Sequence, residues 1–399
     1  MFVIILALFV AALVWLITER VHADRLQSNL QPFYNTAGLS LKGPPGQLVR
    51  SEPLGVAVPG GRGVRVLYRT QRANGSYTFS SGMVFTPNNT SAGTPRPVVA
   101  WAHGTIGQGD QCAPSRLADP IASISWVSSM LQRGWVVTAT DYAGLGTAGT
   151  TGYLIGGDEA HDVLNSVRAA QQVAGAEAGN RFAVWGHSQG GNSALFTASF
   201  ASSYAPQLQL VGTVASAPAA ELPALLNEQY DAALGWVIGP EVLTSWPAYY
   251  SGLSVSAVTT SVGSSNYQRL NNECITPATL EGLVRQGLGQ RLFKTNPINI
   301  PAWHAAAVAN TAPLLKSGQP VLVAESLTDA VVLPNTTALY IQRACQSGSD
   351  LTQLWLTGVG HIQLASVISP EVIAWIGDRF AGVPATSTCN QPLPITPAS

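Results

Sequence analysis

A serine between two glycines is the residue of this chain best suited to covalent chemistry. The pattern G-x-S-x-G, which places a serine at a sharp turn between a strand and a helix, is met by Gly186-His187-Ser188-Gln189-Gly190. Apolar, strand-favouring residues precede it (181–185), and the run after it (191–198) is typical of a helix. The flanking glycines allow so tight a turn to expose the hydroxyl. We therefore expect Ser188 to be a nucleophile, with the helix start aimed where an oxyanion would form.

A serine hydroxyl needs a base within hydrogen-bond reach, and that base needs an orienting acid. In hydrolases with this turn the partners follow in the order serine, acid, histidine. His361 follows the expected strand 351–356 on a loop, whereas the alternative, His304, lies in a long segment between strands. Asp329 follows the expected strand 320–324 and is favoured as the acid over its nearest rival, Glu325.

The oxyanion donors are expected from two loops that meet at the serine. One donor is the backbone N–H of Gln189, the residue after the nucleophile. The other is the N–H of Thr105, because His103-Gly104-Thr105 follows the expected strand 98–103. His103 and His187 are interpreted as structural, and His161 as a solvated helix residue.

Composition excludes several classes of function. Apolar residues make up 46% of the 399-residue chain and charged residues 10%, which is typical of a globular protein. The net charge is −1 and no run of like charge occurs, which argues against nucleic acid and against a polybasic membrane patch. Neither C-x-x-C nor H-x-x-x-H occurs, and the expected chemistry needs no metal or organic cofactor.

The N-terminus and the cysteines indicate export. No charged side chain occurs in residues 1–17, and small residues precede Asp24, so residues 1–23 are predicted to be a signal peptide, with an uncleaved signal anchor as the alternative. The chain is therefore expected to be secreted or periplasmic, or else anchored to a membrane. Two disulfides are expected from the four cysteines, and three pairings are open.

Strand-like and helix-like runs alternate along the chain, which predicts an α/β fold with a mostly parallel central sheet and helices on both faces. Strands 64–70 and 77–86 form an early antiparallel pair, and a helix is expected over 121–133. The core spans 24–217 and 320–399, the latter including a C-terminal tail. Residues 218–319 interrupt the alternation and are predicted to be a helical cap, or lid, over the carboxyl ends of the strands.

With these motifs in place, the chain resembles the secretory lipase family of α/β-hydrolases. The resemblance covers nearly the whole mature chain and is carried, in order, by 102–105, 112–115, 141–146, the elbow, 216–218, the Asp329 loop and Gly360-His361. It implies the α/β-hydrolase fold and a triad of Ser188, Asp329 and His361. It also implies the pairings Cys112–Cys274 and Cys345–Cys389.

The expected function is that of a secreted serine esterase or lipase, with an ester or acylglycerol as substrate and with lid contact to a lipid interface. No protein partner is implied. A peptidase or acyltransferase on the same scaffold is one alternative, since the triad does not decide the acyl acceptor. A non-catalytic protein that binds apolar ligands is another.

Overall fold

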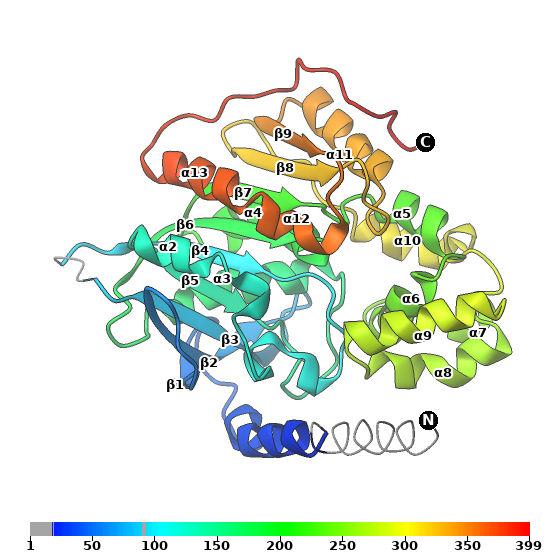
Figure 1. The fold of residues 1–399 in the computed structure, drawn as a ribbon, viewed down its shortest axis with the longest axis horizontal. Helices are drawn as coiled ribbons and strands as arrows, with labels where there is room; N and C mark the ends of the chain where they lie inside the picture. Colours follow the sequence, from blue (N-terminus) through cyan, green and yellow to red (C-terminus); the bar gives the residue numbers. More distant parts are fainter. Residues whose placement is uncertain (1–17, 19, 90–92) are drawn as a thin grey trace, which may run out of the picture.

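The computed structural model describes residues 18, 20–89 and 93–399. Within this part of the chain, nine strands form one sheet in the order β1-β2-β3-β5-β4-β6-β7-β8-β9 (Figure 1). The strands are β1 (Leu48–Pro53), β2 (Gly61–Gln71), β3 (Tyr77–Pro87), β4 (Arg96–Ala102), β5 (Val136–Thr140), β6 (Ala178–His187), β7 (Gln209–Ser216), β8 (Val321–Ser326) and β9 (Leu351–Leu356). Pairing is antiparallel from β1 to β3 and between β3 and β5, and parallel from β5 through β9. The predicted mostly parallel sheet is confirmed.

Helices cover both faces of this sheet because its central strands are apolar on both sides. In β4, Val98 and Ala100 belong to one buried cluster, and Val99 and Trp101 belong to another on the opposite face. The first cluster includes residues of α3 and α4, and the second includes residues of α2 and α13. The core helices are α2 (Val127–Gln132), α3 (Gly156–Ala170), α4 (Gln189–Tyr204), α11 (Pro334–Gln346), α12 (Leu364–Val367) and α13 (Ser369–Phe380).

Two elements differ from the sequence-based expectation. The helix expected over 121–133 is a 3-10 turn at Ala122–Ile124 followed by the short α2. Serines interrupt this segment, and their hydroxyls compete for backbone groups, as when Ser128 donates to the carbonyl of Ser125. The edge strand β1 had no prediction, because its Arg-Ser-Glu centre lacks an alternation of apolar and polar residues.

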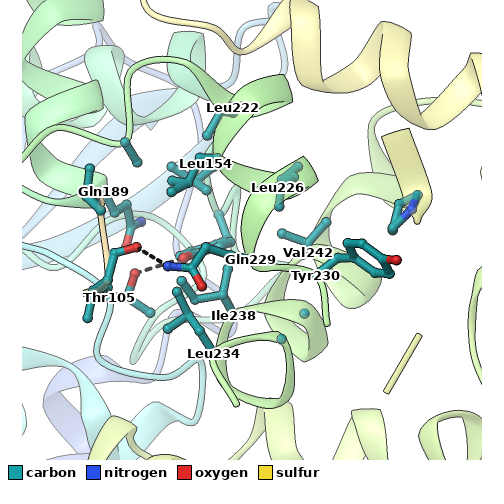
Figure 2. Close-up of a pocket in the computed structure, with 18 of the residues that line it drawn as sticks. Thr105, Leu154, Gln189, Leu222, Leu226, Gln229, Tyr230, Leu234, Ile238 and Val242 are labelled. Carbon is teal, nitrogen blue, oxygen red and sulfur yellow. Dashed lines mark hydrogen bonds between the residues drawn. The ribbon is translucent and has the colours of Figure 1, made fainter. Parts of the chain in front are cut away.

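The segment between β7 and β8 is helical and lies beyond the carboxyl ends of the parallel strands (Figure 1). We refer to residues 218–319 as the cap. Its helices are α5 (Leu222–Gln229), α6 (Gly235–Ser245), α7 (Val255–Val258), α8 (Ser261–Asn271), α9 (Ile275–Gly287) and α10 (Pro301–Ala309). Helices α5 and α6 contribute much of the wall of an apolar pocket (Figure 2).

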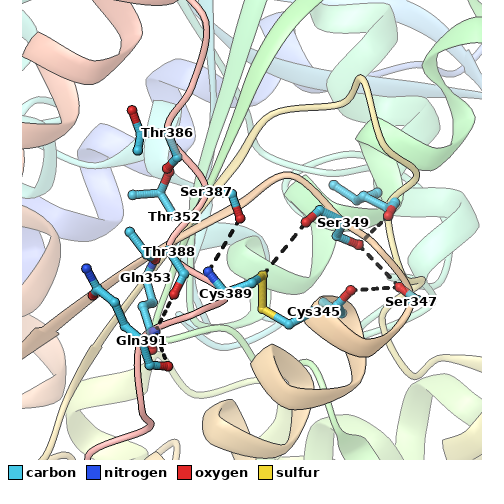
Figure 3. The surroundings of a disulfide bond; sticks show 12 residues. Cys345, Ser347, Ser349, Thr352, Gln353, Thr386, Ser387, Thr388, Cys389 and Gln391 are labelled. Carbon is cyan, nitrogen blue, oxygen red and sulfur yellow. Dashed lines mark hydrogen bonds between the residues drawn. A yellow bond between two sulfur atoms is a disulfide. The ribbon is translucent and has the colours of Figure 1, made fainter.

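Two disulfides join distant parts of the chain, with the pairing that the family resemblance implies. Cys112–Cys274 links the loop after β4 to the start of α9 in the cap, with a Cα–Cα distance of 5.4 Å. Cys345–Cys389 links α11 to the C-terminal tail, with a Cα–Cα distance of 5.3 Å (Figure 3). Each bond therefore ties a segment outside the sheet to the core of the fold.

The disulfide-bound tail covers the outer edge of β9. The backbone N–H of Thr388 donates to the carbonyl of Leu351 over 2.8 Å, and the N–H of Gln353 donates to Oγ1 of Thr388 over 2.8 Å (Figure 3). Backbone groups at a sheet edge otherwise remain open to pairing, so the tail protects this edge.

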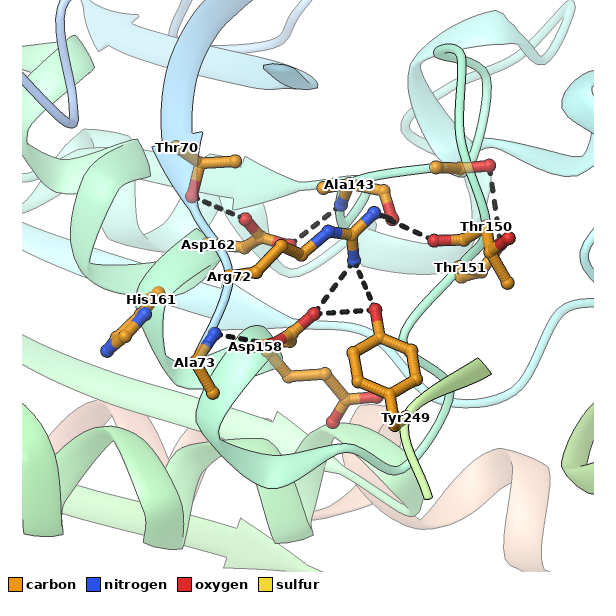
Figure 4. A network of polar contacts seen from close by, with 12 residues as sticks. Thr70, Arg72, Ala73, Ala143, Thr150, Thr151, Asp158, His161, Asp162 and Tyr249 are labelled. Carbon is orange, nitrogen blue, oxygen red and sulfur yellow. Dashed lines mark hydrogen bonds and ion pairs between the residues drawn. The ribbon is translucent and has the colours of Figure 1, made fainter. Parts of the chain in front are cut away.

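A polar network fastens the cap to the core (Figure 4). Nη1 of Arg72, at the end of β2, donates to Oδ2 of Asp158 over 2.9 Å and to the hydroxyl of Tyr249 over 2.8 Å. The Tyr249 hydroxyl in turn donates to Asp158 over 2.7 Å. Because Tyr249 belongs to the cap and Asp158 to α3, this cluster fixes one side of the cap over the core.

The predicted signal peptide falls on residues 1–23, of which 1–17 and 19 lie outside the described residues. Among the residues that are described, no helix combines the length and apolar character needed to cross a membrane.

Candidate active site

Ser188 occupies the turn between β6 and α4, as the G-x-S-x-G pattern predicts. Its backbone has φ 58° and ψ −120°, a conformation that non-glycine residues rarely adopt. A Cβ atom at Gly186 would collide with the carbonyl of Gly190, and one at Gly190 would collide with the carbonyl of Ala102. The two glycines are therefore required by the close approach of β4, β6 and α4 around the serine.

His361 and Asp329 meet although they follow different strands. Nδ1 of His361, the first residue after the loop that leaves β9, lies 2.6 Å from Oδ2 of Asp329 in the loop after β8. The other oxygen, Oδ1 of Asp329, accepts from the N–H groups of Val331 at 2.8 Å and Val332 at 3.1 Å. Both carboxylate oxygens are thus held, and the Asp329 side chain is fully buried. This geometry suits an acid that orients a histidine.

Glu325, the rival for the acid, is hydrogen-bonded to Asp329 itself and to two further groups. Its carboxylate accepts from Oγ1 of Thr337 at 2.6 Å and from the N–H of Ser326 at 2.7 Å. Burial and the neighbouring charge of Asp329 raise the pKa of Glu325 well above its usual value. A carboxyl that favours its neutral form, and whose oxygens are already occupied, is poorly suited to stabilise an imidazolium.

The ring of His361 lies beside the nucleophile turn. Its centroid is 4.6 Å from that of His187, the residue before Ser188, with the rings tilted by 42°. Burial and the neighbouring His361 lower the pKa of His187 well below its usual value, so His187 stays neutral and does not compete as a base. Among the described residues no hydrogen bond joins Ser188 to His361, and such bonds are often loose before substrate binds.

The loop expected to supply an oxyanion donor approaches Ser188 closely. A Cβ atom at Gly104 would lie 3.2 Å from Cβ of Ser188, so a side chain there would crowd the nucleophile. The next residue, Thr105, lines the same pocket as Ser188 and Gln189. The hydroxyls of Thr105 and Tyr153 lie 2.8 Å apart, which fixes the loop against the segment before α3.

Three further histidines were predicted to have no catalytic role, and the expectation for the environment of one of them, His161, was wrong. His103 is buried, with Nδ1 2.7 Å from the carbonyl of Gly104, in keeping with a structural role. His304 is exposed on α10 of the cap. His161 was expected to be solvated but is buried, because its ring stacks on Tyr204 at 3.7 Å between centroids and its Nδ1 bonds the carbonyl of Gln71.

The pocket above Ser188 is lined almost entirely by apolar side chains (Figure 2). The space among its walls, with open solvent included, is ≈ 760 Å³. The apolar lining residues include Leu154, Leu222, Leu225, Leu226, Leu234, Ile238, Val242, Trp246, Phe293, Ile298, Trp303, Val331 and Val332. The polar residues of this wall include Ser188, Thr105 and Gln189. The apolar remainder of the wall is suited to an acyl chain.

Two polar residues near the pocket are marked by no motif in the sequence. Tyr153 contacts Thr105, and the buried Glu159 accepts from the side chain of Gln189. The position of Glu159 in the sequence does not reveal its partner 30 residues away.

Comparisons with known proteins agree with this geometry. A model of the secretory lipase family matches residues 121–388. The chain is 23% identical over 380 residues to a probable inactive lipase of Mycobacterium tuberculosis, covering 89% of this chain and 83% of that protein. It is 25% identical over 362 residues to a secreted triacylglycerol lipase of Malassezia globosa, covering 84% and 74%. The X-ray structure of Candida antarctica lipase A matches with a TM-score of 0.71 and 19% identity, covering 92% of this chain and 90% of that one, which shows an α/β-hydrolase fold.

Proposed function

The chain belongs to the secretory lipase family, and we propose that it is a secreted carboxylic-ester hydrolase that acts on acylglycerols through Ser188, Asp329 and His361. The observation that carries the proposal is the 2.6 Å contact between His361 and Asp329, beside a serine held at a strained strand–helix turn. Secretion is supported by the family and by the two disulfides.

In the proposed mechanism the ester is cleaved through an acyl-enzyme. Oγ of Ser188 attacks the carbonyl carbon while His361 takes its proton, and Asp329 stabilises the imidazolium that forms. The N–H groups of Gln189 and Thr105 bind the oxyanion. Collapse of the tetrahedral intermediate releases the alcohol, which takes the proton from His361. Water then attacks the acyl-enzyme with His361 again as base, and the acid leaves as Ser188 regains its proton.

The proposed substrate follows from the pocket. Its wall offers apolar side chains for an acyl chain and places its few polar groups next to Ser188. In the part of the chain that is described, no group of three or more His, Cys, Asp or Glu side chains is placed to hold a metal ion. The cap that covers the pocket is the part that we expect to contact a lipid interface.

A non-catalytic role deserves a direct test, because one relative is named a probable inactive lipase. The complete set of serine, acid and histidine in this chain favours catalysis over simple binding of apolar ligands. A peptidase or acyltransferase would use the same three side chains, and the apolar pocket favours an acyl ester over a peptide.

The test compares the wild type with Ser188→Ala on p-nitrophenyl esters and with a fluorophosphonate probe. The wild type should hydrolyse the esters and be labelled, and Ser188→Ala should do neither. Ser203→Ala, an exposed serine on the same helix α4, is the matched control and should behave as the wild type. Unchanged turnover in Ser188→Ala contradicts the proposal, and a folded wild type that is never labelled favours a binding protein. Peptide and alcohol-acceptor substrates, tested side by side, separate the other two alternatives.

A further inference from the structure

A buried carboxylate that the proposed mechanism does not use lies directly behind the nucleophile turn. Glu159, in the first turn of α3, is 1% exposed. Its Oε1 accepts from Nε2 of Gln189 at 2.6 Å and from the backbone N–H of Leu154 at 2.9 Å. Its Oε2 accepts from the hydroxyl of Ser193. One side chain thus receives hydrogen bonds from three residues in two separate segments.

The first segment is the start of α4. Gln189 carries the backbone N–H that we propose as an oxyanion donor, and its side chain is held by Glu159. Ser193, one turn later, donates its hydroxyl proton to Glu159, and the same oxygen lies 3.1 Å from the carbonyl oxygen of Gln189. Glu159 therefore holds the first turn of α4 at two points.

The second segment leads to the loop that holds Thr105. Leu154 has φ 52°, an unfavourable conformation for leucine, and its N–H is fixed by Glu159. The preceding residue, Tyr153, places its hydroxyl 2.8 Å from that of Thr105. A change at Glu159 would therefore reach Thr105 through a single intervening side chain.

A second connection reaches the same loop from the other side. The hydroxyl of Tyr142 contacts Oγ of Ser193 at 3.1 Å and the carbonyl of His103 at 3.2 Å. His103 precedes Gly104, whose Cα lies against Ser188. Both proposed oxyanion donors are thereby tied to one carboxylate, on the sides of Gln189 and of Thr105.

We propose that Glu159 is the positioning residue of the oxyanion hole, which holds the N–H groups of Gln189 and Thr105 in register around Ser188. The inference rests on the proposed function and extends it. Since oxyanion donors act only on the charged intermediate, a shift in their position lowers kcat more than it raises KM. Burial raises the pKa of Glu159 to about 8, because the protein interior disfavours the charged form of the carboxyl.

The test is Glu159→Gln. The amide NH₂ of glutamine is a donor, so it cannot accept the hydrogen bonds that one carboxylate oxygen of Glu159 receives. Asp162→Asn is the matched control: Asp162 lies one turn further along α3, is 2% exposed, and accepts from Thr70 at 2.6 Å and from the N–H of Ala143 at 2.7 Å (Figure 4). We expect kcat on a p-nitrophenyl ester to fall about 10- to 100-fold in Glu159→Gln, with KM within about twofold. Asp162→Asn should lose stability to urea but keep its kcat within about twofold.

Inhibition by a trifluoromethyl ketone, which forms a charged tetrahedral adduct with an active serine, separates positioning from folding. Its inhibition constant should rise in Glu159→Gln by the same factor as kcat/KM falls, and should stay unchanged in Asp162→Asn. Equal kinetics and inhibition in the two folded variants overturn the proposal. A wild type that hydrolyses no ester overturns the proposed function, and this inference with it.

A milder pair of variants covers the case in which Glu159→Gln does not fold. Ser193→Ala removes one hydrogen bond to Glu159, and Thr197→Ala removes a buried hydroxyl one turn later on α4 that donates to the carbonyl of Ser193 over 2.7 Å. Ser193→Ala should lower kcat about three- to tenfold and raise the inhibition constant of the ketone by the same factor, because one oxyanion donor loses part of its contribution. If Thr197→Ala loses as much kcat as Ser193→Ala, the proposal is wrong.

Discussion

The imidazole of His361 donates from Nδ1 to Oδ2 of Asp329 over 2.6 Å, although 32 residues separate the two in the chain. The two loops that carry them leave neighbouring parallel strands, β8 and β9, at the same edge of the sheet. Fixing Nδ1 in this way leaves Nε2 as the nitrogen that can take a proton from a serine. In the proposed mechanism the pair therefore sets the direction of proton transfer before any substrate binds.

Replacing Asp329 with asparagine should lower kcat on ester substrates by about 10⁴-fold, because an amide does not enforce the required tautomer or stabilise the imidazolium. KM should change little, since Asp329 is buried behind His361. Steady-state kinetics check this. Asp350→Asn, at the opposite end of β9, is the control and should retain wild-type kcat. A loss below tenfold in Asp329→Asn would mean that His361 has another orienting partner.

The acyl-chain preference should respond to the width of the pocket. Ile238→Trp adds bulk to the α6 wall (Figure 2), so turnover of palmitate esters should fall by about tenfold or more while acetate and butyrate esters are still hydrolysed. The measurement is kcat/KM across a series of p-nitrophenyl esters. Leu283→Trp, on an exposed position of α9, should leave the profile unchanged. An equal loss on all chain lengths in Ile238→Trp would place the acyl chain elsewhere.

Stability should fall as the pH rises, in part through Glu241 of α6. Burial, with a further contribution from the charge of Glu159, raises the pKa of Glu241 to about 8. Between about pH 5 and pH 8 the folded chain keeps this proton while the unfolded chain has lost it, so the free energy of unfolding decreases by about 1.4 kcal/mol per pH unit for this group.

Glu241→Gln cannot titrate, so its unfolding free energy should depend less steeply on pH over that range. Urea unfolding at several pH values measures both slopes. Glu159, whose pKa burial also raises to about 8, faces Glu241 and remains in the variant, so the slope should decrease without vanishing. Identical slopes in the two proteins would show that Glu241 gives up its proton at its ordinary pKa.

The sequence predicts a structural feature well when the pattern for it lies within a few neighbouring residues. The turn at Ser188 is set by two glycines four positions apart, and residues 182–185, which lead into it, form a continuous apolar run. The placement of Asp329 and His361 followed from a general rule, that parallel strands end at one edge of the sheet.

Features that depend on tertiary packing could not be read from the sequence. Glu159 is an ordinary helix residue by its spacing, and its importance comes from Leu154, Gln189 and Ser193 meeting at one point in space. His161 was misjudged for the same reason, since Tyr204 covers it from another helix. The internal order of the cap helices follows from their contacts with one another and with the core.

The bond between Cys345 and Cys389 has a practical consequence for anyone who produces this protein. A host cytoplasm that keeps thiols reduced would yield molecules whose tail can leave β9, and the bare edge of one copy could then pair with the bare edge of the next. Oxidising export, or refolding with a glutathione couple, is therefore the route to a monodisperse preparation.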